Sequence, residues 1–298
     1  MEENRQNIVI GLGEVLIDEN GESRTMGGAP ANFCVHASQL GCKAILVSAV
    51  GEDDDADFIR AKLKEFGVEP CFTTCFLPTG RAVAKPDENG KMTYDIVYPR
   101  AWDRMGIPFY LTDLYVGVGA ICFGTLAGRN PGNGALITAL VKLAEKEGVG
   151  LRVFDVNLRP PYYSEEYIKG LMPLCSVLKL SDEEYPEIRK IYDLDADALK
   201  GCNQLLEKFN LLYVIYTCGA DGSYVFSKDK MSYLKPPAVI VADTIGAGDS
   251  FTATFVASIL DGCIMEEAHR RASEISAYVC SQPGGTPDIT GKFKEILK

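Results

Sequence analysis

Residues 239–251 read Val-Ile-Val-Ala-Asp-Thr-Ile-Gly-Ala-Gly-Asp-Ser-Phe, an apolar run followed by a glycine-containing turn and the start of a helical pattern. The apolar run predicts a strand that ends at Asp243, and the periodicity predicts a helix over 247–262. Small residues in the turn let a ligand come close to the backbone, and the first amides of a helix have no intrahelical partner. Together with the helix dipole, the amides of residues 246–248 therefore predict an anion-binding site.

Asp249 falls in the first turn of this predicted helix, where the dipole favours a negative charge, so we expect it to be ionised at pH 7. A carboxylate beside an anion site suits phosphoryl transfer, because it can take the proton of the attacking hydroxyl while the amides hold the phosphoryl group. The low pKa that this implies is tolerable, since a loose transition state needs the proton only late. The alternative is a capped helix in which Asp249 only complements the dipole. The spacing fits neither a Walker loop nor the dinucleotide fingerprint.

Outside this stretch, short apolar runs alternate with segments of helical spacing, which predicts an α/β fold with a largely parallel sheet and helices on both faces. The predicted strands are 8–12, 44–50, 120–123, 151–155, 177–180 and 212–217. The predicted helices are 31–40, 56–66, 135–147, 167–174, 183–191, 198–209 and, after the glycine turn, 247–262 and 266–280.

The composition is that of an ordinary folded chain of 298 residues, with 47% hydrophobic and 24% charged residues, which argues against disorder. The net charge of −11 makes nucleic acid and anionic membranes improbable partners. No apolar run is long enough to span a bilayer, and the acidic start is not typical of a signal peptide, so we expect a cytoplasmic protein. The ten cysteines contain no C-x-x-C pair and the histidines number two, so we expect reduced thiols and a site built from carboxylates and glycine loops.

Residues 81–98 break the α/β pattern, because apolar and polar positions alternate on both sides of Asn89-Gly90, which is a strong hairpin signal. The segment 14–26 is also short, polar and strand-like. The two segments together predict a small antiparallel sheet that serves as a lid beside the main sheet. A surface decoration is the alternative.

Two motifs of this chain, in this order, resemble those of the ribokinase-like (PfkB) sugar kinases, and among these the fructokinases. The first is Gly-Gly-Ala-Pro-Ala-Asn at 27–32, preceded by Gly-Glu-Val-Leu-Ile-Asp at 13–18, and the second is Asp-Thr-Ile-Gly-Ala-Gly-Asp-Ser-Phe at 243–251. The resemblance extends from about Ile8 to about Pro287. It implies a single kinase domain over 1–298, with a three-layer α/β/α core and a lid formed by about 14–26 and 81–104.

The resemblance implies that Asp249 is the catalytic base and that the amides of Gly246, Ala247 and Gly248 hold the γ-phosphate. It implies a sugar site built from Asp18, Gly28, Asn32, Trp102 and Asn157. In that site, carboxylate and amide groups would bind hydroxyls, the glycine would let the sugar approach, and the tryptophan would cover its apolar face. The alternatives are a plain turn for the glycines, a helix-entry role for Asn32, and a lid-core or dimer contact for Trp102.

The resemblance places the nucleotide along three further strand ends. The residues are Arg159, Lys179, Ser181, Glu184, Thr217, Gly219 and Gly222. A guanidinium at Arg159 suits phosphates, with a surface ion pair as its alternative. Ser181 stands where asparagine is commoner in the family, and it can also form a capping box with Glu184.

Many relatives hold a monovalent cation behind the anion site. The matching groups here are the Asp243 side chain and the Ile245 carbonyl, with the loop 281–287 closing the site. That loop departs from the commoner small-residue pattern, so potassium stays an open alternative.

The resemblance thus implies a kinase that uses ATP and Mg²⁺ to phosphorylate a free sugar, most simply fructose at its 6-hydroxyl. Ribose, 2-keto-3-deoxygluconate and nucleosides remain alternative acceptors, and a non-catalytic sugar- or nucleotide-binding module is the rival class. Exposed strand edges of the lid invite pairing, so a homodimer through the lid is a further expectation. Gly11-Leu-Gly13 does not indicate an NAD-linked dehydrogenase. The dinucleotide-binding fingerprint needs a third glycine and a helix that starts there, and both are missing.

Overall fold

The computed structural model describes residues 7–21, 23–86, 92–107, 115 and 117–297. Nine strands form the main sheet, in the order β13-β12-β11-β10-β9-β8-β1-β4-β5. Their bounds are β1 (Ile8–Leu12), β4 (Lys43–Val50), β5 (Glu69–Thr74), β8 (Val118–Gly124), β9 (Leu151–Asp155), β10 (Val177–Ser181), β11 (Tyr213–Thr217), β12 (Ser223–Phe226) and β13 (Met231–Leu234). All neighbours pair in parallel except β11–β12 and β12–β13. The expected parallel α/β sheet is confirmed.

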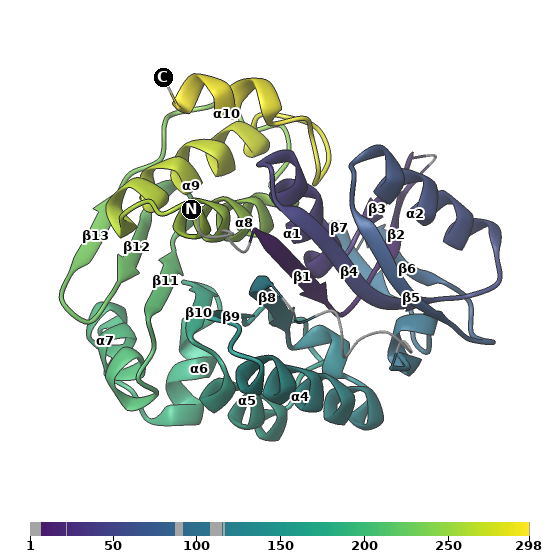
Figure 1. The fold of residues 1–298 in the computed structure, drawn as a ribbon, viewed down its shortest axis with the longest axis horizontal. Coiled ribbons are helices and arrows are strands. Elements are labelled where there is room, and N and C mark those ends of the chain that lie inside the picture. Colours follow the sequence, from purple (N-terminus) through teal and green to yellow (C-terminus); the bar gives the residue numbers. More distant parts are fainter. Residues whose placement is uncertain (1–6, 22, 87–91, 108–114, 116, 298) are drawn as a thin grey trace.

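Helices cover both faces of this sheet (Figure 1). One face carries α4 (Pro131–Lys146), α5 (Glu165–Leu171), α6 (Tyr185–Tyr192) and α7 (Ala198–Lys208), and the other carries α1 (Ala29–Gln39), α8 (Ala247–Leu260) and α9 (Met265–Cys280), with α10 (Thr290–Ile296) outside α9. Strand β1 shows why two layers form: Ile10 and Leu12 belong to one buried cluster and Val9 to the other. This alternation with a period of two buries apolar side chains on both faces. Among the described residues, no helix is long and apolar enough to cross a membrane.

The apolar run Val239–Val241 does not form the strand that its composition predicts. It is an irregular segment in which Ile240 is 92% exposed. The strand order of the main sheet ends at β13, and among the described residues the run pairs with none of its strands. Strands β5, β12 and β13 and helix α10 were not among the predicted elements, because their short or polar segments carry little periodicity.

The predicted lid is a second sheet of four strands, in the order β3-β2-β6-β7. Its bounds are β2 (Leu16–Asn20), β3 (Ser23–Gly27), β6 (Gly80–Pro86) and β7 (Met92–Ile96). The β6–β7 hairpin is antiparallel as predicted, and its Asn89-Gly90 turn lies outside the described residues. The pairs β2–β3 and β6–β7 are antiparallel and the pair β2–β6 is parallel, so the small lid sheet is present and is mixed rather than wholly antiparallel. The chain passes through α1, β4, α2 (Asp54–Glu65) and β5 between β2 and β6, and so enters β6 in the direction of β2.

A buried arginine fixes the lid to the core. Arg129 follows η2 (Leu126–Gly128), and its Nε and Nη2 donate to the two carboxylate oxygens of Asp103, at 2.7 and 2.8 Å. Asp103 lies in η1 (Ala101–Arg104), just after the lid hairpin. The same guanidinium donates to the carbonyls of Ile96 and Val97 and lies 3.9 Å from the ring centroid of Trp102. We call this set of contacts the Arg129 clamp.

Candidate active site

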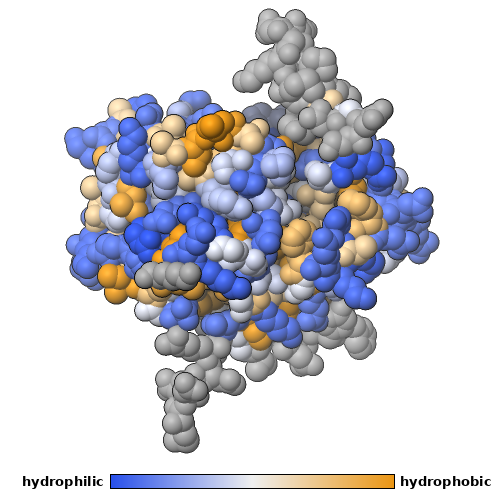
Figure 2. Space-filling view, turned by 90° about the horizontal axis from the view of Figure 1, so that it is seen from above, coloured by the Kyte–Doolittle hydropathy of each residue, from blue (hydrophilic) through white to orange (hydrophobic). Residues whose placement is uncertain are grey.

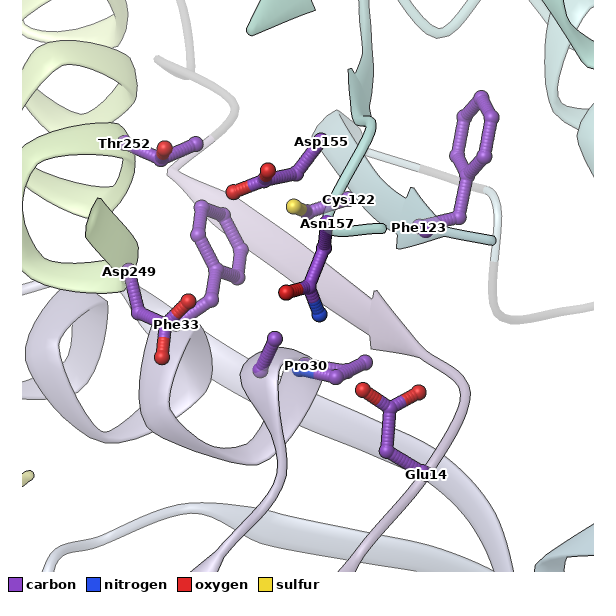
Figure 3. Close-up of a pocket in the computed structure, with 11 residues that line it drawn as sticks. Glu14, Pro30, Phe33, Cys122, Phe123, Asp155, Asn157, Asp249 and Thr252 are labelled. Atoms are coloured by element: carbon purple, nitrogen blue, oxygen red, sulfur yellow. The ribbon is translucent and has the colours of Figure 1, made fainter. Parts of the chain in front are cut away.

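The site lies at the carboxyl ends of the central strands, where α1 and α8 begin. Open α/β sheets bind ligands at this edge, because loops there leave a crevice. Figure 3 shows the cavity, in which Asp249 lies opposite Asp155 and Asn157, with Glu14 below. The lining residues are Glu14, Ala29, Pro30, Phe33, Cys122, Phe123, Gly124, Asp155, Asn157, Asp249 and Thr252.

The first turn of α8 has the geometry of an anion site. Gly246 takes a left-handed φ of 75°, and a Cβ there would lie 2.1 Å from the carbonyl oxygen of Gly285, so both conformation and space require glycine. A Cβ at Gly248 would lie 3.0 Å from Nζ of Lys179, which places an ammonium group against the turn. The amide of Ala247 donates to the carbonyl of Thr244 at 3.3 Å, so of the three predicted amides this one is already engaged.

Asp249 and Asn32 meet across a sequence separation of 217 residues. The Nδ2 of Asn32 donates to Oδ2 of Asp249 at 2.8 Å, which joins the two motifs in one site. Burial raises the pKa of Asp249, opposed by the Asn32 hydrogen bond and by the charges of Lys179 and Arg159. The expected low pKa was therefore wrong in direction, because removal of the carboxyl group from water outweighs the helix dipole.

A buried ion pair lies beside this turn. Lys179 on β10 donates from Nζ to Oδ1 of Asp155, at the end of β9, over 3.0 Å. Burial raises the pKa of Asp155 to about 6, although Lys179 opposes the shift. For Lys179 burial acts to lower the pKa, but the charges of Asp155, Glu184 and Asp249 outweigh it, so the ammonium stays charged.

Glu184 clamps two loops together. Its Oε1 accepts from the amide of Leu158 at 2.9 Å, and its Oε2 accepts from the amide of Ser181 at 2.7 Å. The amide of Glu184 donates back to Oγ of Ser181 at 3.3 Å, so the capping box that was the alternative role of these residues is formed. The contact to Leu158 goes further, because it fixes the loop that carries Asn157 and Arg159.

That loop is held in an unusual conformation. Asn157 has a φ of 41°, and Oγ1 of Thr125 donates to the carbonyl of Val156 at 2.8 Å. Such a conformation in a non-glycine residue persists only where its surroundings fix it. Burial raises the pKa values of Asp18 and Glu14, and the Arg159 guanidinium further along opposes both rises, so its charge lies within range of both carboxyl groups.

Asp18 reaches the site from the lid. Burial raises its pKa to about 6, with Arg159 opposing the shift and Asp249 adding to it. Its Oδ2 occupies the space above Gly27, where a Cβ would come into direct conflict with it. Gly28, with a φ of 105°, instead packs against the backbone of Glu14 at the start of α1. The motif thus supplies both the turn and the room that the carboxylate needs.

Trp102 does not reach the cavity. Its ring is fully buried under the Arg129 guanidinium, and a Cβ at Gly80 would lie 2.6 Å from its Cδ1. A role of Trp102 in covering the sugar stays a prediction. Its aromatic surface packs against the clamp that fixes the lid, which is the lid-core alternative.

The remaining nucleotide residues lie along the same sheet edge. Thr217 pairs in register with Ser181, and its carbonyl accepts from the amide of Asp182 at 2.9 Å. Gly219 and Gly222 both take positive φ values in the turn that leads to β12. None of these three predicted residues lines the cavity around Asp249, and their nucleotide contacts stay a prediction.

The predicted cation groups come together with the C-terminal loop. Asp243 accepts from the amide of Ile245 at 3.0 Å and from the amide of Gly284 at 3.2 Å. Nε2 of His36 lies 2.9 Å from the carbonyl oxygen of Gly285. These contacts fix the loop against the anion site, and the binding of potassium stays a prediction.

Glu14 is a carboxyl group of the cavity lining that the residue-by-residue prediction missed. It lies two residues after β1, as Asp155 ends β9, so its place at a strand end was a readable signal. Thr125 and Arg129 were also missed, because no spacing rule marks a residue that supports another one.

The site carries more acidic than basic groups. Glu14, Asp18, Asp155, Glu184 and Asp249 face Lys179 and Arg159, and the mutual repulsion contributes to the raised pKa values. Among the described residues, no three acidic, cysteine or histidine side chains form a metal cage. A magnesium ion usually keeps waters and phosphate oxygens as ligands, so this excess of carboxylates fits a cation that arrives with a nucleotide.

The comparisons agree with this geometry. Over residues 4–290 the sequence matches the family described as pfkB family carbohydrate kinase. The chain is 25% identical over 306 residues to an ATP-dependent 6-phosphofructokinase of Thermoanaerobacterium thermosaccharolyticum, covering 94% of this chain and 90% of that protein. It is 25% identical over 260 residues to a fructokinase of Klebsiella pneumoniae, covering 83% of each. A fructokinase structure with bound ATP from Xylella fastidiosa has a TM-score of 0.85 at 18% identity, covering 98% of each chain.

Proposed function

Because the chain belongs to the pfkB family of carbohydrate kinases, we propose that it transfers the γ-phosphate of ATP to a hydroxyl of a free sugar, with the 6-hydroxyl of fructose as the first candidate. The observation that carries the proposal is the Asn32–Asp249 contact at the first turn of α8. It places a carboxylate beside an anion site, which is the arrangement that phosphoryl transfer to a hydroxyl needs.

Asp249 would act as the general base. Its Oδ2 is held by Asn32, and among the described residues no donor engages Oδ1, which leaves that oxygen for the sugar hydroxyl. The proton would pass to Asp249 as the sugar oxygen bonds to the γ-phosphorus and the bond from that phosphorus to the β-phosphate oxygen breaks. The first amides of α8 and the ammonium of Lys179 would stabilise the charge on the transferred group.

The nucleotide would lie along the strand ends from β9 to β11. Arg159 and Lys179 would face its phosphates. The exposed apolar run Val239–Val241 directly precedes the anion site and offers a surface for the purine ring. Magnesium would neutralise phosphate charge when bound, with Asp155 and Glu184 facing its water ligands.

The cavity favours a neutral acceptor over a sugar phosphate. Its described lining contains the carboxylates of Glu14, Asp155 and Asp249 and no lysine or arginine. On the lid, Arg24 and Arg81 are paired with Asp55 and Glu19. The phosphate group of an acceptor such as fructose 6-phosphate would meet the negative charge of this cavity. Fructose is therefore the better candidate.

The test is ADP release with magnesium ATP and a panel of fructose, fructose 6-phosphate, tagatose, ribose, 2-keto-3-deoxygluconate, glucose and adenosine. We expect turnover on fructose, dependence on magnesium, and loss of turnover in Asp249→Asn, which excludes a contaminating kinase. Turnover on another panel member would change the proposed substrate and leave the proposed reaction, ATP-dependent phosphorylation, in place. Failure to turn over any of them, with ATP bound in calorimetry, would favour the non-catalytic binding module.

A homodimer through the lid edges belongs to the same proposal. The outer strands β3 and β7 leave edges to which a second copy could add. Light scattering at assay concentration would show twice the chain mass, and a monomer would contradict this part alone.

A further inference from the structure

Glu14 is a buried carboxyl group that the mechanism above does not use. It is 2% exposed, and it lies at the carboxyl end of β1 on the wall of the cavity. Figure 3 shows its carboxylate pointing toward Pro30 and Asn157. A buried carboxyl group without a role would cost stability, so its position calls for a physical account.

The two oxygens of Glu14 have different surroundings. The backbone amides of Glu14 and Ala29 act to lower the pKa of the carboxyl group, and Ala29 is the first residue of α1, so the carboxyl group lies at the amino end of that helix and caps its dipole. Oε2 is fully buried, and no group among the described residues hydrogen-bonds to it. The capping contacts therefore explain why a carboxylate is present and leave its second oxygen bare in the cavity.

A second bare acceptor belongs to Asn32, whose Nδ2 holds the cavity residue Asp249. Oδ1 of the same side chain is also buried, with no partner among the described residues. Asn32 is the fourth residue of α1, the helix that Glu14 caps. Two unpaired acceptors near the catalytic carboxylate are costly in the free protein unless a ligand or water supplies donors.

We propose that Glu14 is a ligand of the acceptor sugar, with Oε2 accepting a hydrogen bond from a hydroxyl other than the one that is phosphorylated. The inference rests on the proposed function and deepens it. The unpaired oxygens of Glu14 and Asn32 need two hydroxyl donors in addition to the hydroxyl that is phosphorylated. The acceptor class is then a polyhydroxylated neutral sugar. A deoxygenated or aromatic acceptor would leave buried acceptors unpaired, and sites of this kind discriminate strongly against such analogues.

Glu14→Gln is the variant that separates this role from helix capping. The amide oxygen can still accept from Ala29, while an NH2 group replaces the bare acceptor in the cavity. We expect the KM for the sugar to rise roughly tenfold to a hundredfold, the loss typical of one hydrogen bond to a charged group. We expect the KM for ATP and kcat to change by less than about threefold. The matched control is Glu145→Gln, which alters an exposed glutamate on α4 and should leave all three constants unchanged.

The decisive experiment combines the Glu14→Gln variant with deoxy analogues of the sugar. Wild type, Glu14→Gln and Glu145→Gln are assayed at pH 8 with fructose and its 1-, 3- and 4-deoxy analogues, or with the monodeoxy analogues of whichever panel sugar wild type prefers. One analogue should be poor for wild type and yet lose nothing further in Glu14→Gln, because both changes remove the same hydrogen bond.

An unchanged sugar KM in Glu14→Gln, or an equal penalty on every analogue, would overturn the inference while wild-type turnover keeps the proposed function. A wild type that neither phosphorylates nor binds any panel sugar in calorimetry would overturn both.

Discussion

The Arg129 clamp and the Asp249 cavity are both buried charged clusters, and they differ in how their charged groups are paired. In the clamp, Nε, Nη1 and Nη2 of Arg129 all donate and both oxygens of Asp103 accept, although Nε1 of Trp102 has no partner among the described residues. At the active site, Oε2 of Glu14 on the cavity wall and Oδ1 of Asn32 beside Asp249 are buried with no partner in the described part of the chain.

The difference shows which cluster holds the fold and which awaits a ligand. A fully paired guanidinium and carboxylate lock one arrangement of the lid on the core. A cluster with unpaired acceptors and excess negative charge is less stable on its own and is completed by donors and cations from outside. Each prediction below changes one cluster and compares the effect on stability with the effect on turnover.

The largest effect on stability is expected at the clamp. Arg129→Met leaves the fully buried carboxylate of Asp103 without its cation, and the loss of one partner of a buried pair typically costs about 3–5 kcal/mol. The measurement is urea unfolding of the variant against wild type. Lys190→Met is the control, because Lys190 forms an exposed pair with Glu187 whose loss should cost less than about 0.5 kcal/mol. Equal midpoints for both variants would show that the clamp does not hold the lid.

An effect of up to about 3 kcal/mol, with a defined pH dependence, is expected at Glu14. Burial raises its pKa from 4.5 to about 7, so the folded protein binds a proton that the unfolded chain releases in this range. The free energy of unfolding of wild type should therefore fall as the pH rises from 4.5 to 7, and this contribution should be absent in Glu14→Gln. Unfolding without ligands at pH 5 and pH 8 measures it: the variant should gain on wild type at the higher pH. A constant difference at both pH values would contradict the shift.

The smallest effect is expected at Gly248. In Gly248→Ala the new Cβ would lie 3.0 Å from Nζ of Lys179, so the ammonium must move away from the anion site. We expect kcat to fall about tenfold, near 1.4 kcal/mol, with little change in the urea midpoint. Gly291→Ala on α10, where no atom lies within 4 Å of the new Cβ, should leave kcat unchanged. An equal fall of kcat in both variants would contradict a role of the Lys179 ammonium in the reaction.

The parallel core could be predicted from the sequence because it follows from local patterns, and the family resemblance implied that the two motifs meet in one site. Strand-end positions placed Asp155, Ser181 and Thr217 on one edge, and the register confirms that placement for the last two. The helix-start pattern placed Asp249 beside the glycine turn, and the structure adds its contact with Asn32.

The misses have a common physical cause, since each depends on contacts between distant parts of the chain. The prediction for Asp249 considered the helix dipole alone, whereas burial by residues from other parts of the chain raises its pKa. The packing of Trp102 against Arg129 likewise joins residues that are distant in the sequence, and no local pattern announced it. The run Val239–Val241 has the composition of a strand and no neighbouring strand to pair with.

The most direct test of the contrast measures ADP release and the free energy of unfolding for two matched variants, Asp249→Asn and Asp103→Asn. The account predicts that Asp249→Asn loses turnover by about 10²–10⁴-fold and keeps or gains stability, because it removes one charge from a crowded acidic site. It predicts that Asp103→Asn loses stability and, at a temperature where it is folded, keeps turnover within about tenfold of wild type. Near-wild-type turnover in Asp249→Asn, or loss of turnover in a fully stable Asp103→Asn, would contradict it.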